Sequence, residues 1–277
     1  MSIRPVKRLI KSKPTLEGAG VHLRRAFGFG NTKEFDPFLL LDDFRNDVPE
    51  DYLAGFPWHP HRGIETITYV LAGTVQHGDS IGHSGVIGAG DVQWMTAGSG
   101  IIHQEMPKGD QAGRMHGFQL WGNLPASLKM TAPRYQEVKA GEVPEITDDD
   151  GTHVRVVCGN FWGKTGPVDG VAADPIYLDV SVSPASERLF RWRRLGMPSP
   201  MFLQGAENSA MPRGRLQCQQ KRSNGWTRLP PWRRTTDRSY SLIAVTMLRC
   251  KPETMEFASC SFQESRSKNP SPGTVPS

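Results

Sequence analysis

Two pairs of potential metal ligands recur at the same spacing, and both lie in segments with the composition of β-strands. The first pair, His59 and His61, stands in FPWHPHRGIETITYVLAG, and the second, His103 and Glu105, stands in GSGIIHQEMP. Because residues i and i+2 of a strand point to the same face, each pair can present both side chains to one ion. Three imidazoles and a carboxylate suit a divalent ion of Fe, Mn, Co, Ni, Cu or Zn. A fold that uses all four residues must bring two distant strands together.

Between the two pairs, the chain consists of short predicted strands separated by tight turns. The segments ETITYVLAG, TVQHGDSIGHSGVIGAGD and VQWMTAGSG are rich in Thr, Ile, Val and Tyr, and glycine marks the breaks. Such a run predicts a small antiparallel barrel with both ligand pairs at its mouth. The order of an HxH pair, Glu65, glycine-rich turns and a later histidine is the two-part signature of a cupin barrel.

Four segments resemble the pirin family, namely DPFLLLDDF, FPWHPHRGIETITYVLAGTVQHGDS, GDVQWMTAGSGIIHQEMP and HGFQLWGNLP. The resemblance is dense through about Pro125 and implies an all-β bicupin, with two jelly-roll barrels and one metal site in the N-terminal barrel. It also implies the ligand set that strand spacing selects independently, which is His59, His61, His103 and Glu105. Many cupins use the Glu after HxH, whereas pirins use the carboxylate after the later histidine, so we place Glu65 outside the ligand set.

The same resemblance implies a chemistry for this site. It implies Fe(II) as the one divalent metal ion, and some pirins resemble quercetin 2,3-dioxygenases, which bind a flavonol on the metal and open its ring with O₂. In that scheme the three histidines fix the ion, and Glu105 is both an anionic ligand and the candidate catalytic base for the flavonol hydroxyl. Phe56, Trp58 and Trp94 are candidates for lining a planar aromatic pocket, although core packing is the favoured role for at least two of them.

Other functional classes remain open from the sequence. One is a non-enzymatic, metal-dependent redox sensor that binds a protein partner, as proposed for eukaryotic pirins that act on transcription, and it needs the same four ligands. Another is an inactive, truncated bicupin. A lone histidine on a strand is more often a hydrogen-bonded or surface residue than a ligand, which is the favoured interpretation for His77, His83, His116 and His153. Core packing is likewise favoured for Trp121.

The length of 277 residues suits two domains of ordinary size. We expect an N-terminal cupin barrel with the metal site over residues 1–130, a linker and the start of a C-terminal cupin over 131–185, and an aberrant basic tail over 186–277. The polar run TAPRYQEVKAGEVPEITDDDG marks the first boundary. After it, THVRVVCGNFWGKTGPV and DPIYLDVSVSP again have the composition of strands, as a second barrel requires.

The composition changes sharply from about Ser186. Residues 186–277 hold 16 Lys and Arg against 6 Asp and Glu, a net charge of +10, whereas residues 1–185 hold 17 against 22, a net charge of −5. The tail shows neither strand alternation nor a helical apolar face, so we expect it to be disordered and the second barrel to be truncated. Because the basic charge belongs to this tail, nucleic acid is not an expected partner.

A shifted reading frame offers one explanation of the tail. If the last nucleotide of each codon is joined to the first two of the next, the genetic code permits residues 186–208 to be decoded as RKTFPLETTRHAFAYVFAGRGKF. The chain from Glu256 can likewise be decoded as IRFLLVSGKPLEEPVAWYGPF. Both strings resemble pirin segments, so we hypothesise a frameshift close to Ala185, which the nucleotide sequence tests.

The chain carries no apolar run long enough for a signal peptide or a membrane span, so a membrane is not an expected partner. Cys158 is the only cysteine before the tail, which implies no disulfide framework and predicts a reducing, cytoplasmic location. The sequence leaves open the physiological substrate, the metal in the cell and the oligomeric state.

Overall fold

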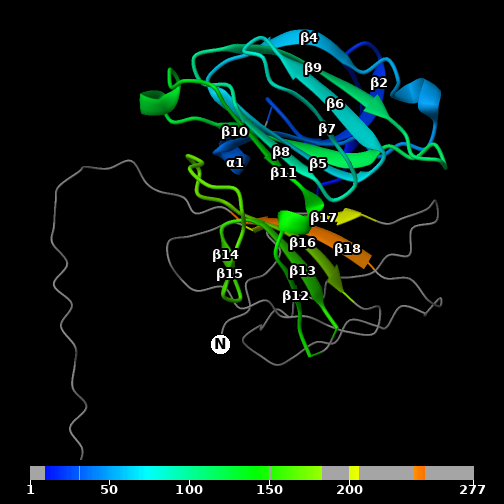
Figure 1. Cartoon of the computed structure of the whole chain (residues 1–277), viewed down its shortest axis with the longest axis vertical. Helices are drawn as coiled ribbons and strands as arrows, with labels where there is room; N and C mark the ends of the chain where they lie inside the picture. The colour runs from blue at the N-terminus through cyan, green and yellow to red at the C-terminus, as the bar shows by residue number, and fades with distance from the viewer. Residues whose placement is uncertain (1–9, 31, 150, 183–199, 206–239, 247–277) are drawn as a thin grey trace, which may run out of the picture.

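The computed structural model describes residues 10–30, 32–149, 151–182, 200–205 and 240–246, which form mainly β-strands in two stacked halves (Figure 1). The N-terminal half contains β1 (Lys13–Glu17), β2 (Val21–Phe27), β3 (Phe38–Asp43), β4 (Phe56–His61), β5 (Ile64–Ala72), β6 (Thr74–Asp79), β7 (Ser84–Ile87), β8 (Val92–Thr96), β9 (Ile101–Lys108), β10 (His116–Asn123) and β11 (Arg134–Val138). The C-terminal half contains β12 (Glu145–Thr147), β13 (His153–Cys158), β14 (Asn160–Phe161), β15 (Lys164–Thr165), β16 (Ile176–Val182), β17 (Pro200–Gly205) and β18 (Tyr240–Thr246).

Helical structure in the described residues is limited to short segments. These are α1 (Thr32–Phe35) and the 3₁₀ turns Pro49–Asp51, Ala126–Leu128 and Ala140–Glu142. Within the described part of the chain, none of the helices has the length and apolar character needed to span a membrane.

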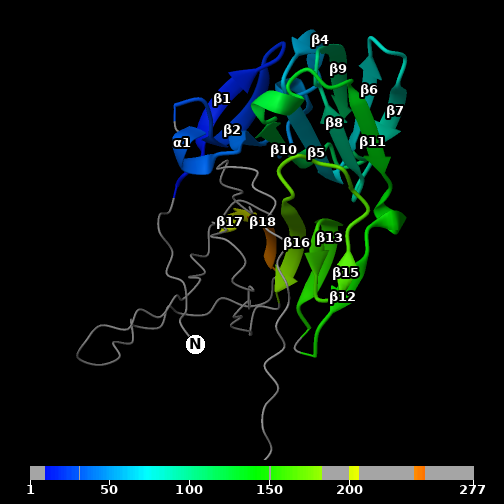
Figure 2. The same cartoon turned by 90° about the vertical axis from the view of Figure 1, so that its left-hand side faces the viewer.

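The N-terminal half is a barrel built from two antiparallel sheets. One has the strand order β1-β2-β3-β10-β5-β8-β11, and the other has the order β4-β9-β6-β7. Both sheets contribute side chains to the apolar interior, which contains Val21, Leu23, Phe44, Tyr52, Val70, Val75, Ile87 and Met115. Figure 2 shows β4, β9, β6 and β7 together on the side of the barrel away from the C-terminal half.

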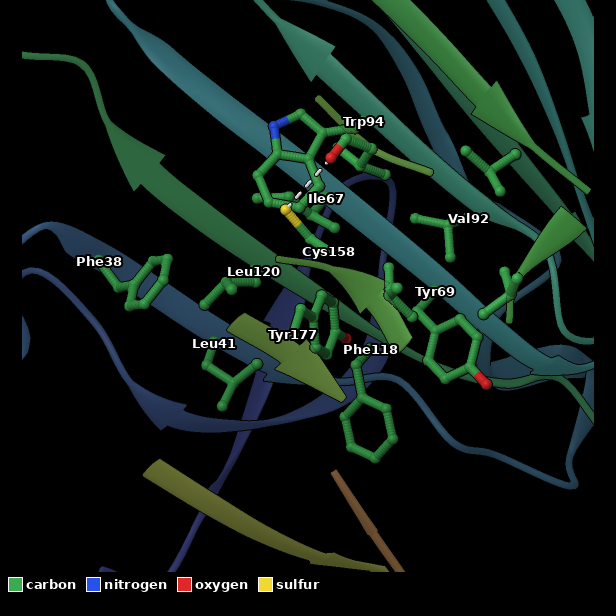
Figure 3. Packing of buried hydrophobic residues seen from close by; sticks show 14 of the residues in the cluster. Phe38, Leu41, Ile67, Tyr69, Val92, Trp94, Phe118, Leu120, Cys158 and Tyr177 are labelled. Atoms are coloured by element: carbon green, nitrogen blue, oxygen red, sulfur yellow. Dashed lines mark hydrogen bonds between the residues drawn. The ribbon is translucent and has the colours of Figure 1, made fainter. Parts of the chain in front are cut away.

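The opposite face of the seven-stranded sheet packs against the C-terminal half. A second apolar cluster spans this boundary, and Figure 3 shows Cys158 and Tyr177 of the C-terminal half among Ile67, Trp94 and Phe118 of the barrel. Burial on both faces explains why β5 is buried almost without interruption, where a half-exposed strand would alternate. The two halves therefore share one core, and the all-β bicupin expectation is confirmed.

The C-terminal sheet has the order β12-β13-β16-β18-β17 and includes two strands from the basic tail. Here the structure differs from the prediction, which found no strand pattern after about residue 186. The segment YSLIAVT of β18 is rich in residues that favour strands, and it pairs with β16, whose edge offers unpaired backbone groups. The rest of the expected disordered tail, and most of the segment to which the frameshift hypothesis applies, lies outside the described residues.

A partly buried group of hydrogen bonds around Tyr69 and Arg155 joins the two halves. The Tyr69 hydroxyl of β5 donates to Asp179 Oδ2 of β16 at 2.7 Å, and Arg155 Nη1 of β13 donates to the same hydroxyl at 2.6 Å. Arg155 Nη2 also donates to the backbone oxygens of Gly90 and Ala140, both at 3.1 Å. Burial raises the pKa of Tyr69, so the phenol stays protonated and can donate to Asp179.

A Tyr69→Phe substitution tests this contact. Removing the hydroxyl leaves buried groups of Asp179 and Arg155 without a partner, so we expect the free energy of unfolding to fall by about 1–3 kcal/mol in urea titrations. Tyr135→Phe is the control, because that hydroxyl donates only to Glu137 on its own strand. Equal decreases in the free energy of unfolding in the two variants would contradict a stabilising role for the contact between the halves.

Candidate metal centre

Three histidines converge where β4 and β9 pair. In this antiparallel pair, His59 lies directly opposite His103, and His61 follows on the same face of β4 as His59. One ring nitrogen from each of the three lies within 4.8 Å of the others. The closest pair is the Nε2 atoms of His59 and His103, which are 3.0 Å apart. Strand register therefore creates a cluster of imidazole nitrogens from residues more than forty positions apart in the chain.

The protonation of these rings fits a metal site. His59 Nδ1 lies 2.8 Å from the backbone oxygen of Pro57, which can only accept, so Nδ1 carries a proton and Nε2 is the nitrogen turned toward His103. Metal-binding histidines are commonly oriented by this kind of hydrogen bond. Burial, followed by the neighbouring histidines, lowers the pKa of His61 to about 4. Burial also lowers the pKa of His103 to about 4.

Neutral imidazole is the form that binds a metal. The surroundings of His103 also fit a metal ligand. Its side chain is completely buried, and among the described residues its Nδ1 has no hydrogen-bond partner. The three side chains thus form a compact set of nitrogen donors. They fit a divalent cation, whereas the geometry does not identify which one.

Glu105 lies on the same face of β9 as His103, but its oxygens are held by a separate set of donors. Thr68 Oγ1 of β5 donates to Oε1 at 2.9 Å, and Gln119 Nε2 of β10 donates to Oε2 at 2.8 Å. Burial acts to raise the pKa of this carboxyl, but His103 and the two donors outweigh it and hold the pKa below its usual value. Glu105 is therefore an ionised, oriented carboxylate next to the histidine cluster, and it is not one of the three converging residues.

Glu65 faces away from this cluster. It is an odd number of residues from Thr68 on β5, so the two side chains point to opposite faces of the sheet. Thr96 Oγ1 donates to Glu65 Oε1 at 2.9 Å, and burial raises the pKa of Glu65. The structure thus places Glu65 apart from the histidines.

Two residues of β10 that the sequence did not select complete the surroundings of Glu105. Trp121 Nε1 donates to Gln119 Oε1 at 3.2 Å, which fixes the Gln119 amide with its NH₂ toward Glu105. The Trp121 ring also packs edge-on against His61, with ring centroids 4.9 Å apart. Trp121 therefore forms a wall of the site and is not in the described apolar clusters, contrary to the core role expected for it. The i, i+2 spacing of Gln119 and Trp121 on one strand is the sequence feature that indicates a shared face.

His77 and Asp79 of β6 form a layer behind the cluster, because they pair directly with Glu105 and His103 of β9. The His77 ring lies 5.4 Å from that of His103 and has Gln93 Nε2 3.0 Å from its Nδ1. Asp79 accepts hydrogen bonds from two backbone N–H groups and lies 2.8 Å from His83 Nδ1. These histidines support the site without joining the converging set.

Two further histidines lie away from the cluster, and three aromatic residues proposed for the substrate pocket differ in burial. His116 Nε2 is 2.6 Å from Asp47, and His153 Nε2 is 3.2 Å from Glu145. Trp94 is buried in the core shared by the two halves, Phe56 packs against the barrel interior, and Trp58 is 55% exposed. Core packing thus accounts for Trp94, whereas Phe56 also lies opposite Glu105 in the pairing of β4 with β9.

Comparison with known proteins agrees with this fold. A model of the pirin family matches residues 20–122. A pirin-like protein of Caulobacter vibrioides is 53% identical over 183 residues, which are 66% of this chain and 66% of that protein. A Pseudomonas aeruginosa protein named "Putative quercetin 2,3-dioxygenase" is 44% identical over 190 residues, 67% of this chain and 66% of that protein. Human pirin is 42% identical over 187 residues, 67% of this chain and 62% of its own length.

Solved structures give the same result. A crystal structure of quercetin 2,3-dioxygenase from Acinetobacter baumannii superposes with a TM-score of 0.59 at 30% identity, covering 73% of this chain and 68% of that one. The protein GK1651 from Geobacillus kaustophilus superposes with a TM-score of 0.58 at 34% identity, covering 74% of this chain and 75% of that one. The chain spans no more than 66% of the length of the curated relatives named above.

The lowered pKa values predict how stability depends on pH. His61 and His103 titrate near 6.5 when unfolded and near 4 in the folded, metal-free protein. Between these values the unfolded state binds more protons, so the free energy of unfolding falls as the pH drops, by on the order of 1–2 kcal/mol per histidine at about pH 5. Urea titrations of the metal-free chain at about pH 7.5 and about pH 5 measure this loss. A His61→Gln, His103→Gln variant should lose clearly less, and an equal loss would contradict the assignment.

The hydrogen bond from Thr68 to Glu105 predicts an effect on metal affinity. Thr68→Val keeps the side-chain shape but removes the donor to Glu105, so we expect metal affinity in chelator competition to fall about 10-fold or more. Thr96→Val is the matched control, because it removes an equally short hydrogen bond to the buried carboxylate of Glu65. If Thr96→Val weakens metal binding as much as Thr68→Val, the choice of Glu105 over Glu65 is wrong.

Proposed function

The chain belongs to the pirin family, and on that premise we propose that it is a metal-dependent dioxygenase that acts on flavonols such as quercetin, with O₂ as co-substrate. The observation that carries the proposal is the convergence of His59, His61 and His103, with burial lowering the pKa of His61 and His103 so that these two rings are neutral near pH 7. The quercetin dioxygenase named among its relatives supports the choice of substrate class. Fe(II) is the proposed metal, one ion per chain.

We assign Glu105 as the fourth, anionic ligand. It lies two residues after His103 on the same strand face and is held in its ionised form. Four protein ligands on a six-coordinate ion leave positions for adjacent oxygens of a flavonol. A bound ion of this kind would supply Lewis acidity and redox chemistry with O₂.

The residues of the chain then have distinct roles. Glu105 is the candidate catalytic base, because an ionised carboxylate can accept the proton of the flavonol hydroxyl. Thr68 and Gln119 hold that carboxylate in one orientation, and Trp121 fixes the Gln119 amide. The Trp121 ring beside His61 offers an aromatic surface to a planar ligand.

We place this activity in the cytoplasm. The proposed ligands include no cysteine, and Cys158 is buried in the core shared by the two halves. Burial raises the pKa of its thiol to about 12, so this cysteine is protonated and needs no oxidising environment.

Metal analysis tests the ligand assignment. We expect about one metal ion per purified full-length chain and almost none in a His59→Ala, His61→Ala variant, because too few donors then remain. His153→Ala is the control, since that histidine is paired with Glu145 far from the cluster in the fold. Equal metal content in the parent and the double variant would refute the assignment.

Oxygen consumption tests the activity. The Fe(II)-loaded chain should consume O₂ with quercetin, and Glu105→Gln should lower kcat/KM by about 10²-fold or more because it removes both the base and the anionic ligand. A fully metal-loaded chain that consumes no O₂ would contradict the dioxygenase proposal and favour a redox sensor that binds a protein partner.

A further inference from the structure

A small, partly open cavity of the N-terminal barrel borders the metal centre on the Glu105 side. Its walls come from both sheets, and Glu105, Thr68 and Gln119 line it, whereas His59, His61 and His103 do not. The remaining lining is Val21, Leu23, Asp42, Phe44, Tyr52, Phe56, Val75, Pro107 and Met115. The cavity therefore reaches the proposed carboxylate ligand from the barrel interior, separately from the histidine side of the site.

The polar groups around this cavity already have partners. Both oxygens of Glu105 accept hydrogen bonds from Thr68 and Gln119. Both oxygens of Asp42 accept hydrogen bonds from Arg25, at 2.8 and 2.7 Å, and the Tyr52 hydroxyl donates to a backbone oxygen. A buried water needs two to four polar partners, and this lining presents mainly carbon to the space.

The size of the cavity limits what can occupy it. Its volume is about 20 Å³, which is room for about one water or one diatomic molecule and far too little for a flavonol. Cavities of proteins that stay empty of water are apolar, and one of about 150 Å³ lined by apolar side chains binds xenon. Size and lining together therefore favour a small apolar gas over water or the organic substrate.

We propose that this cavity is a binding site for a small apolar gas, and that for this chain the gas is dioxygen. The inference rests on the proposed function for the identity of the gas. Dioxygen would then approach the metal centre past Glu105 from the barrel interior, while the flavonol enters on the side of His61 and Trp121. The two substrates would not compete for one entrance.

Xenon NMR on the metal-free full-length chain tests the site without relying on activity. The xenon signal should shift with protein concentration, and Val75→Phe should reduce that shift to the level of non-specific contacts by filling the cavity. Val86→Phe is the matched control, because it adds the same bulk at an exposed valine of the neighbouring strand β7. Leu23→Ala should strengthen xenon binding by enlarging the cavity, which gives a second variant if Val75→Phe does not fold.

Oxygen kinetics test the identity of the gas. In the Fe(II)-loaded chain, Val75→Phe should raise KM for O₂ several-fold while KM for quercetin and the metal content stay at the parent values. An unchanged KM for O₂ would overturn the dioxygen assignment. Absence of a xenon shift in both the parent chain and Leu23→Ala, whose cavity is larger, would overturn the gas site itself. Lack of any turnover in the parent would instead defeat the proposed function, with the xenon result still deciding the gas site.

Discussion

The pairing of β4 with β9 is the constraint on which the site depends. Its register sets His59 opposite His103 and leaves Glu105 on the same face of β9. A shift of one residue would turn His103 and Glu105 to the outside of the barrel, because side chains alternate along a strand. The same strand pairs with β6, which brings Asp79 and His77 behind the cluster. One strand therefore carries two proposed ligands and connects them to their supporting residues.

Two buried glutamates lie on opposite sides of the seven-stranded sheet, and their pKa values shift in opposite directions. Glu65 points toward the core shared with the C-terminal half, where burial raises its pKa. Glu105 projects from the opposing sheet into the barrel interior, where Gln119, Thr68 and His103 lower its pKa in spite of burial. Each carboxylate accepts a hydrogen bond from a threonine at 2.9 Å, so the difference comes from the remaining neighbours. Only Glu105 is both ionised and next to the imidazoles.

Much of the fold and part of the site could be predicted from the sequence. The i, i+2 spacing placed His59 with His61, and the pirin resemblance supplied the pairing with His103 that the structure displays. The donors to Glu105 could not be predicted this way, because Thr68 and Gln119 come from two other strands and their approach depends on register. The sequence predicts a core position for Trp121, because the residue type alone does not distinguish a ring in the core from one that packs on His61. The strand β18 was missed because its residues follow a long basic segment, although YSLIAVT itself favours a strand.

The central claim is that His59, His61, His103 and Glu105 hold one metal ion together. The most direct measurement is anomalous diffraction at the iron edge from crystals of the Fe(II)-loaded chain. The account predicts a single peak bound by one nitrogen of each histidine and by a carboxylate oxygen of Glu105. An anomalous peak next to other residues would contradict this account. So would an ion bound by the histidines while both Glu105 oxygens contact only Thr68 and Gln119.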